Sequence, residues 1–202
     1  MAIASDLSRI PLNRPNEPQS ETVAQLFGGG SAGAINGTGV ALTEHTGGVH
    51  QTKLTLTGVS ITMTDATTAG SHGSLKLYDF PAGVIQVLGA TTDLTITAAA
   101  GIGATASVVG SLGTVTTQTD NAALTSTEAD IIPSTACTLT TSAGTMKGKS
   151  TATEMAAGIF DGTSTAKDLF LNFAVPDAGS TANSTLTVNG TVTFTWANHG
   201  DN

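Results

Sequence analysis

The stretch "TLTVNGTVTFTW", residues 185–196, decides how the last part of the chain folds. Its centre, Asn189-Gly190, is a strong signal for a two-residue β-hairpin turn. A hairpin here would place Val188 opposite Thr191, so that apolar and polar side chains share one face. As a single strand the stretch alternates without a break, because successive side chains of a strand point to opposite faces. Its apolar residues then all lie on one face: Leu186, Val188, Val192, Phe194 and Trp196.

We therefore predict one long strand, with Gly190 at a bend or a close contact and Trp196 in the core. A second stretch, "KLTLTGVSITMT" (53–64), shows the same alternation with one interruption. Its apolar residues fall at even positions up to Leu56 and at odd positions from Val59. An extra residue that restores the apolar face is a β-bulge, which we predict at Gly58.

The composition predicts an all-β fold. Threonine is the most abundant of the 202 residues, glycine contributes 24, and 39% of the chain is hydrophobic. Threonine favours strands and glycine favours turns, whereas this much hydrophobicity argues against disorder. We expect an antiparallel β-sandwich, jelly-roll-like, with about eight or nine strands. Besides the two stretches above, the candidate strands are 73–80, 83–89, 93–97, 105–109, 112–117 and 168–175.

Three local features complete the predicted architecture. The turn at 81–83, Pro-Ala-Gly, has a spacing typical of a hairpin. Thr125 and Glu128 fit a capping box, which predicts one short helix near 126–132, ended by Pro133. With only 4% aromatic residues the core should be thin enough for a partner to complete it.

The first 30 residues differ from the rest and are predicted to be an extended N-terminal arm, followed by a sandwich domain over 31–202. They hold both arginines of the chain and three of its six prolines, which favour an extended backbone. Two interpretations stay open: a disordered tail, or an arm that becomes ordered on a neighbouring subunit. In the second, the partner-binding residues are Arg9, Pro11, Arg14, Pro15 and Pro18.

Charge and motifs exclude several classes of function. A net charge of −8 with seven Lys and Arg residues disfavours binding to nucleic acid, which needs clustered cations. The sequence has no long apolar run, so we expect no membrane span and no signal peptide. Cys137 is expected to be a small buried side chain. No nucleophile has a recognisable base, so we predict no enzyme, no catalytic residues and no cofactor.

Glu44, His45 and His50 are the residues nearest to a metal-binding pattern. The glycines at 47 and 48 place the two histidines in a loop, without the i, i+2 spacing that would align two ligands on a strand. We therefore expect solvated loop histidines and no metal site.

The segments "LYDFPAGVIQVLGATTDLTI", "LTSTEADIIPST", "FDGTSTAKDLFLNFAV" and "LTVNGTVTFTWANHGD" carry a resemblance over 73–202. This part of the chain resembles structural proteins of tailed bacteriophage virions, in particular capsid decoration or cement proteins. The resemblance implies a component of the capsid exterior with a jelly-roll or related sandwich and no catalytic residues. The implied partners are the major capsid protein and copies of the chain itself, as a homodimer or homotrimer.

Two other functions remain as alternatives. The first is a head-fibre or tail-fibre module that binds a host glycan, with Tyr78 or Trp196 as the aromatic residue that would stack on a sugar. The second, a lattice-forming capsid protein, is less expected because the sequence lacks a long helical pattern.

Overall fold

The computed structural model describes residues 33–65, 70–116 and 124–200. Within these ranges the chain forms an antiparallel sheet of eleven strands and three short helical segments. The strands are β1 (Ala34–Ile35), β2 (Val40–His45), β3 (His50–Asp65), β4 (Ser71–Asp79), β5 (Val84–Ala98), β6 (Ser107–Gly113), β7 (Ile132–Thr138), β8 (Ala143–Lys149), β9 (Ile159–Asp161), β10 (Asp168–Val175) and β11 (Ser184–Asn198). The helical segments are η2 (Ser126–Glu128), α2 (Ala152–Ala157) and η3 (Asp177–Gly179).

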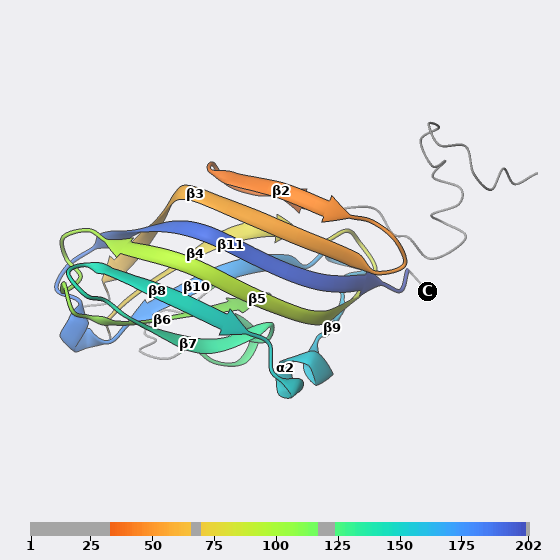
Figure 1. Ribbon diagram of the computed structural model, residues 1–202. Helices are drawn as coiled ribbons and strands as arrows, with labels where there is room; N and C mark the ends of the chain where they lie inside the picture. Colours follow the sequence, from red (N-terminus) through yellow and green to blue (C-terminus); the bar gives the residue numbers. More distant parts are fainter. Residues whose placement is uncertain (1–32, 66–69, 117–123, 201–202) are drawn as a thin grey trace, which may run out of the picture.

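The strands form two layers around one core (Figure 1). One layer has the order β2-β3-β11-β5-β8, and the other has the order β7-β6-β10-β4. The far end of β3 joins them, since Thr64 pairs with His72 of β4. At the opposite edge a tight turn at Thr141 and Ser142, both with positive φ, leads from β7 into β8. The expected all-β sandwich is therefore confirmed.

The long strand β11 is the centre of the first layer. It pairs with β3 on one side and with β5 on the other over most of its length. Gly190 lies inside the strand with a φ of +130°, and no turn forms there. Leu186, Val188, Val192, Phe194 and Trp196 are all buried on the inner face. The prediction of one continuous strand with a core tryptophan is confirmed.

The β-bulge predicted at Gly58 is also present. Thr57 and Gly58 of β3 together oppose Asn189 of β11, and Gly58 has a φ of +61°. The Gly58 N–H donates a 2.7 Å hydrogen bond to the side-chain oxygen of Asn189. Asn189 therefore supports the bulge in the neighbouring strand, while Gly190 lets the backbone of β5 approach at Asp93.

Several predicted strand boundaries were wrong. Segments 83–89 and 93–97 are one strand, β5, in which a register shift opposite Thr195 and Trp196 moves the buried positions from odd to even numbers. Segments 105–109 and 112–117 likewise merge into β6. The turn at 81–83 does not form a hairpin, because β4 and β5 belong to opposite layers and pair with different strands.

Four of the core's aromatic residues form a cluster at one end. Tyr78, Phe80, Phe194 and Trp196 pack edge to face, with ring centroids 5.2–6.2 Å apart. Phe173 of β10 and Phe160 of β9 are buried outside this group, and the rest of the core is mainly aliphatic and continuous along the sandwich. Cys137 is buried in it as predicted, and burial raises the pKa of its thiol.

Residues 124–131, which precede β7, cover part of the outer face of the second layer, where Leu124 and Ala129 pack with Ala174. Asn172 of β10 is buried there and donates hydrogen bonds to the carbonyl oxygens of Val115 (2.9 Å) and Glu128 (2.8 Å). The capping box of Thr125 and Glu128 forms, but the helix is one 3-10 turn, and Ile132 already begins β7. The expected longer helix does not form because Ile132 pairs with Leu112 of β6.

Replacing Gly190 by valine should be strongly destabilising. A Cβ at this position would overlap the carbonyl oxygen of Asp93, and the φ of +130° suits no branched residue. We expect a loss of at least ~3 kcal/mol in the free energy of unfolding, measured by urea denaturation.

The matched control is Gly58→Asn in the bulge. No atom lies within 4 Å of a Cβ there, and asparagine tolerates positive φ, so the cost should stay below ~1 kcal/mol. Equal losses for the two variants would contradict the role assigned to Gly190.

Candidate functional site

The predicted arm residues Arg9, Pro11, Arg14, Pro15 and Pro18 lie outside the described residues. The described chain begins at Gly33, whose N–H donates a 2.9 Å hydrogen bond to the phenol oxygen of Tyr78. A side chain at Gly33 would overlap the Tyr78 ring. The point where the N-terminal segment joins the sandwich is therefore held by a core residue.

Tyr78 belongs to a buried polar network. Its hydroxyl donates to Glu44 Oε2 at 2.8 Å, and the other oxygen of Glu44 lies 2.8 Å from His50 Nδ1. His50 is fully buried and the Glu44 side chain is 5% exposed. Burial and then the bond to Glu44 raise the pKa of Tyr78. Because Glu44 and His50 come from β2 and β3 and Tyr78 from β4, the network joins the two layers.

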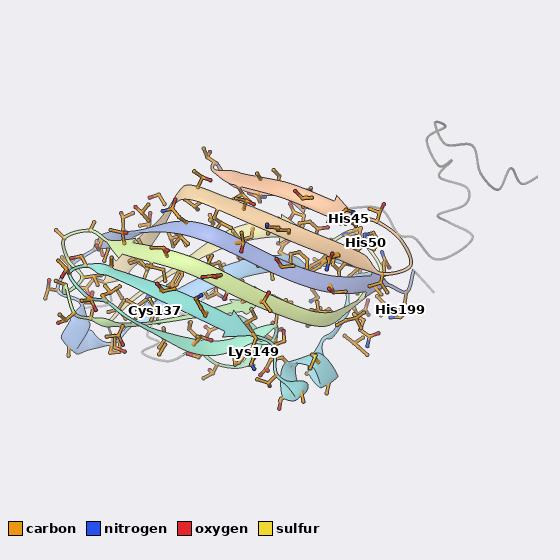
Figure 2. All side chains as sticks on the ribbon, viewed as in Figure 1. His45, His50, Cys137, Lys149 and His199 are labelled. Atoms are coloured by element: carbon orange, nitrogen blue, oxygen red, sulfur yellow. The ribbon has the colours of Figure 1, made fainter. Side chains whose placement is uncertain are left out.

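His50 also stacks on Trp196, with ring centroids 4.0 Å apart and 20° between the ring planes. The indole N–H of Trp196 donates to the Thr52 hydroxyl at 2.9 Å. Figure 2 shows His45, His50 and His199 at the same end of the sandwich. Of these, His199 is exposed and lies 2.9 Å from the Gln86 side chain.

The expectation of solvated loop histidines is wrong for His50, which begins β3 and lies in the core. The alternation of residues 53–64 carried the signal: His50 and Thr52 have the same even parity as Leu54. Among the described residues, no group of three or more His, Cys, Asp or Glu side chains is arranged to hold a metal ion.

A charged cluster lies beside this network, where β4 pairs with β10. Asp79 and Asp168 are directly opposite each other, and the Lys76 ammonium contacts both carboxylates. Burial acts to raise the pKa of Asp79, but hydrogen bonds from Lys76, Asp168 and Asn36 outweigh it and lower that pKa. Burial, followed by the hydrogen bond with Asp79, raises the pKa of Asp168. Lys76 thus offsets a like-charge pair that would otherwise weaken the sheet.

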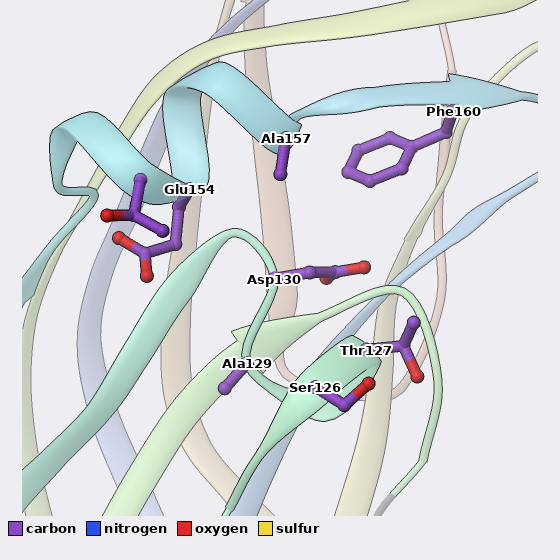
Figure 3. A pocket seen from close by; sticks show the side chains of 8 residues that line it. Ser126, Thr127, Ala129, Asp130, Glu154, Ala157 and Phe160 are labelled. Atoms are coloured by element: carbon purple, nitrogen blue, oxygen red, sulfur yellow. The ribbon is translucent and has the colours of Figure 1, made fainter.

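A cleft of about 480 Å³ opens between η2 and α2 (Figure 3). One wall comes from the segment after η2, and the other from α2 and β9. Figure 3 shows Asp130 in the middle, with the Phe160 ring and Ala157 facing it from the other wall. The lining residues are Ser126, Thr127, Ala129, Asp130, Thr153, Glu154, Ala157 and Phe160.

The two carboxylates of the cleft are held in place by threonines. Asp130 accepts hydrogen bonds from the Thr114 N–H (2.9 Å) and hydroxyl (2.6 Å). Burial raises the pKa of Asp130, and the Thr114 bonds only partly offset this. Glu154 closes the capping box of α2 with Thr151. Although burial acts against it, this contact lowers the pKa of Glu154.

Sequence analysis missed this cleft. The pattern of residues 142–158 favours loop or edge strands. This is right for β8, the last strand of its layer, and wrong for α2, which is a helix. The pattern Thr151-x-x-Glu154 is a capping box and was the available signal for α2. Its position opposite Asp130 depends on the pairing of β8 and β9 with β5, which the sequence pattern does not reveal.

The cleft can bind a cation or a partly apolar cationic group, since it has two oriented carboxylates and the apolar side chains of Ala129, Ala157 and Phe160. It does not form a catalytic pair of the Ser–His or Cys–His type, because none of its lining residues is histidine or cysteine. In the described part of the chain no helix has the length and apolar character needed to cross a bilayer. A scan against protein-family models and a search of curated protein sequences gave no match.

The buried phenol of Tyr78 should resist ionisation. Its pKa is raised above the unfolded value of about 10, so folding favours the neutral form. This contribution to stability is complete below pH 10 and is lost as the pH rises further. Tyr78 is the single tyrosine of the chain, so phenolate absorbance at 295 nm reports it alone. We expect no phenolate signal at pH 11 while the protein stays folded.

In protein unfolded in urea, the Tyr78 phenol should ionise near pH 10. The Tyr78→Phe variant should show no phenolate absorbance. Phenolate appearing near pH 10 in folded protein would contradict the buried network.

Proposed function

We propose that the protein is a non-enzymatic structural protein of a virion, which binds the capsid exterior and stabilises it as a cement or decoration protein. The observation that supports this proposal is the outward face of the β3–β11–β5 layer. There the side chains between the buried positions are mostly threonine.

The threonines of this face are aligned across strands. Thr191 of β11 lies opposite Thr55 of β3 and Asp93 of β5, and Thr187 lies between Ser60 and Thr97. Neighbouring strands are about 4.8 Å apart and alternate residues about 6.8 Å apart, so the hydroxyls form a regular array. Each hydroxyl offers one modest hydrogen bond to a partner surface.

A repeating capsid lattice suits such a face. Many weak contacts become tight binding when several copies attach together, because each bound copy raises the effective concentration of the next. The proposed partners are the major capsid protein and copies of the chain itself, in a homodimer or homotrimer. The net charge of −8 disfavours contact with packaged DNA and fits a place on the capsid exterior.

The burial of the aromatic residues argues against the glycan-binding alternative. Tyr78 and Trp196 are both fully buried, so neither ring can stack on a sugar. The other rings near them, Phe80 and Phe194, are buried as well. The polar side chains His50 and Glu44 are likewise buried and bonded to each other, so they are not available to a sugar.

Placing arginine at Thr55 and Thr95 should weaken capsid binding. Both side chains are exposed on the proposed face, so folding should change little. We expect at least about tenfold weaker co-sedimentation with empty capsids, because each bound copy would press two bulky charges against its partner. Thr138→Arg, at an exposed position of β7 in the other layer, is the control. Unchanged binding of the Thr55/Thr95 variant would refute this face as the contact.

Removing residues 1–25 should leave the sandwich folded and reduce both capsid binding and the self-associated mass measured by light scattering. The described strands use none of these residues. A discrete dimer or trimer with the same number of subunits before and after truncation, together with unchanged capsid affinity, would rule out the arm as a strap between subunits.

A further inference from the structure

The cleft between η2 and α2 combines negative charge with apolar walls. Asp130 and Glu154 supply two carboxylates, and none of the eight lining residues is cationic. Both oxygens of Asp130 are oriented by Thr114, and the carboxylate also accepts from its own backbone N–H, which leaves acceptor capacity for a further donor. A guanidinium group matches such a carboxylate through paired N–H donors.

The helix beside the cleft lacks cover. α2 has six residues and none of them is buried. A helix of this length is not stable by itself and depends on tertiary packing. Met155 (41% exposed) and Ile159 (57% exposed) do not line the cleft, but Thr153 and Ala157, which do, are exposed as well. The helix wall of the cleft is therefore a surface that a partner can stabilise.

The chain itself contains a segment of matching chemistry. Residues 9–15 read "RIPLNRP", so that Arg9 and Arg14, the only arginines of the chain, flank the apolar Ile10 and Leu12. Prolines at 11 and 15 restrict the backbone to extended conformations. An extended segment of this kind loses little conformational entropy when it docks in a groove.

We propose that residues 9–15 dock in the cleft, with the arginines on Asp130 and Glu154 and the apolar side chains against Ala129, Ala157 and Phe160. This inference rests on the arm of the proposed function and identifies its receptor. The 18 residues from Pro15 to Gly33 span up to about 60 Å when extended. The first described strand, β1, pairs with Asp79 at the end of β4, and β9 of the cleft pairs with Val84 at the start of β5, so both lie at the same end of the sandwich. The segment is therefore long enough to reach the cleft of its own copy, and it could also reach that of an adjoining copy.

Hydrogen exchange in the full chain tests the docking without any capsid. Amides of 126–130 and 151–160 should exchange about tenfold faster in an Arg9→Gln/Arg14→Gln variant than in the unaltered protein, because charge-assisted contacts are lost. Amides of the central strand β11 should not change. Equal exchange at the cleft in the two proteins would overturn the proposal. Protection that fades on dilution assigns the segment to a neighbouring copy, and protection that persists assigns it to its own; both support the docking.

Direct binding provides the second measurement. A dye-labelled peptide of residues 5–18 is added to the full-chain Arg9→Gln/Arg14→Gln variant and followed by fluorescence anisotropy. Asp130→Asn/Glu154→Gln in this background should weaken binding about tenfold or more. Asparagine can keep both contacts with Thr114, and glutamine can keep the capping box, so the fold of the cleft is retained. Asp93→Asn, an exposed carboxylate paired with Lys147, is the matched control and should change nothing.

The remaining outcomes separate this inference from the proposed function. Capsid binding with no effect of the arginine variants at the cleft would leave the cement function intact and overturn the docking. Docking of the segment in a protein that does not bind capsids would support this inference and overturn the cement function. Protection of the cleft by a neutral oligosaccharide, with no binding of the peptide, would assign the cleft to a sugar and overturn the proposal.

Discussion

The whole sandwich depends on the alternation of β11, which is buried on one face over 15 residues. Its apolar side chains determine the register of β3 and β5 on either side, because a slip by one residue would turn every one of them to solvent. The bulge at Gly58 is the consequence on β3, and the register shift near Leu88 is the consequence on β5. The pair Asn189-Gly190 stabilises this register. The Asn189 side chain accepts a hydrogen bond from the bulge at Gly58, and Gly190 leaves room for the backbone of β5.

The same alternation explains why polar residues lie in the core. His50 and Thr52 continue the inward positions of β3 and meet Trp196 of β11, while Glu44 continues those of β2. Hydrogen bonds offset much of the cost of burying these groups: Glu44 bonds to His50 and Tyr78, and Thr52 accepts from Trp196, whereas His50 Nε2 has no partner among the described residues. The network therefore links the two layers at the end of the sandwich that holds Tyr78 and Trp196. It also binds Gly33, where the N-terminal segment joins the sandwich. It leaves these residues no access to an external ligand.

The outer surfaces are divided in a way that fits an assembly protein. The β3–β11–β5 face presents aligned hydroxyls with few charges, whereas the cleft near α2 gathers two carboxylates beside apolar walls. The first surface suits a broad partner bound through many weak contacts, and the second suits a narrow cationic one. The first 15 residues contain a segment of this second kind, with two arginines and apolar side chains, and this is the basis of the proposed docking.

The sequence by itself determined the strand class, the continuity of β11, the bulge at Gly58 and the burial of Trp196 and Cys137, because these follow from a period of two along a local stretch. It did not determine that residues 83–98 form one strand or that 81–83 crosses between layers, since pairing partners are distant in the sequence. The position of His50 was visible in its parity but was outweighed by the nearby glycines. Only the tertiary structure brought Asp130 opposite Glu154, because that cleft depends on β8 and β9 both pairing with β5.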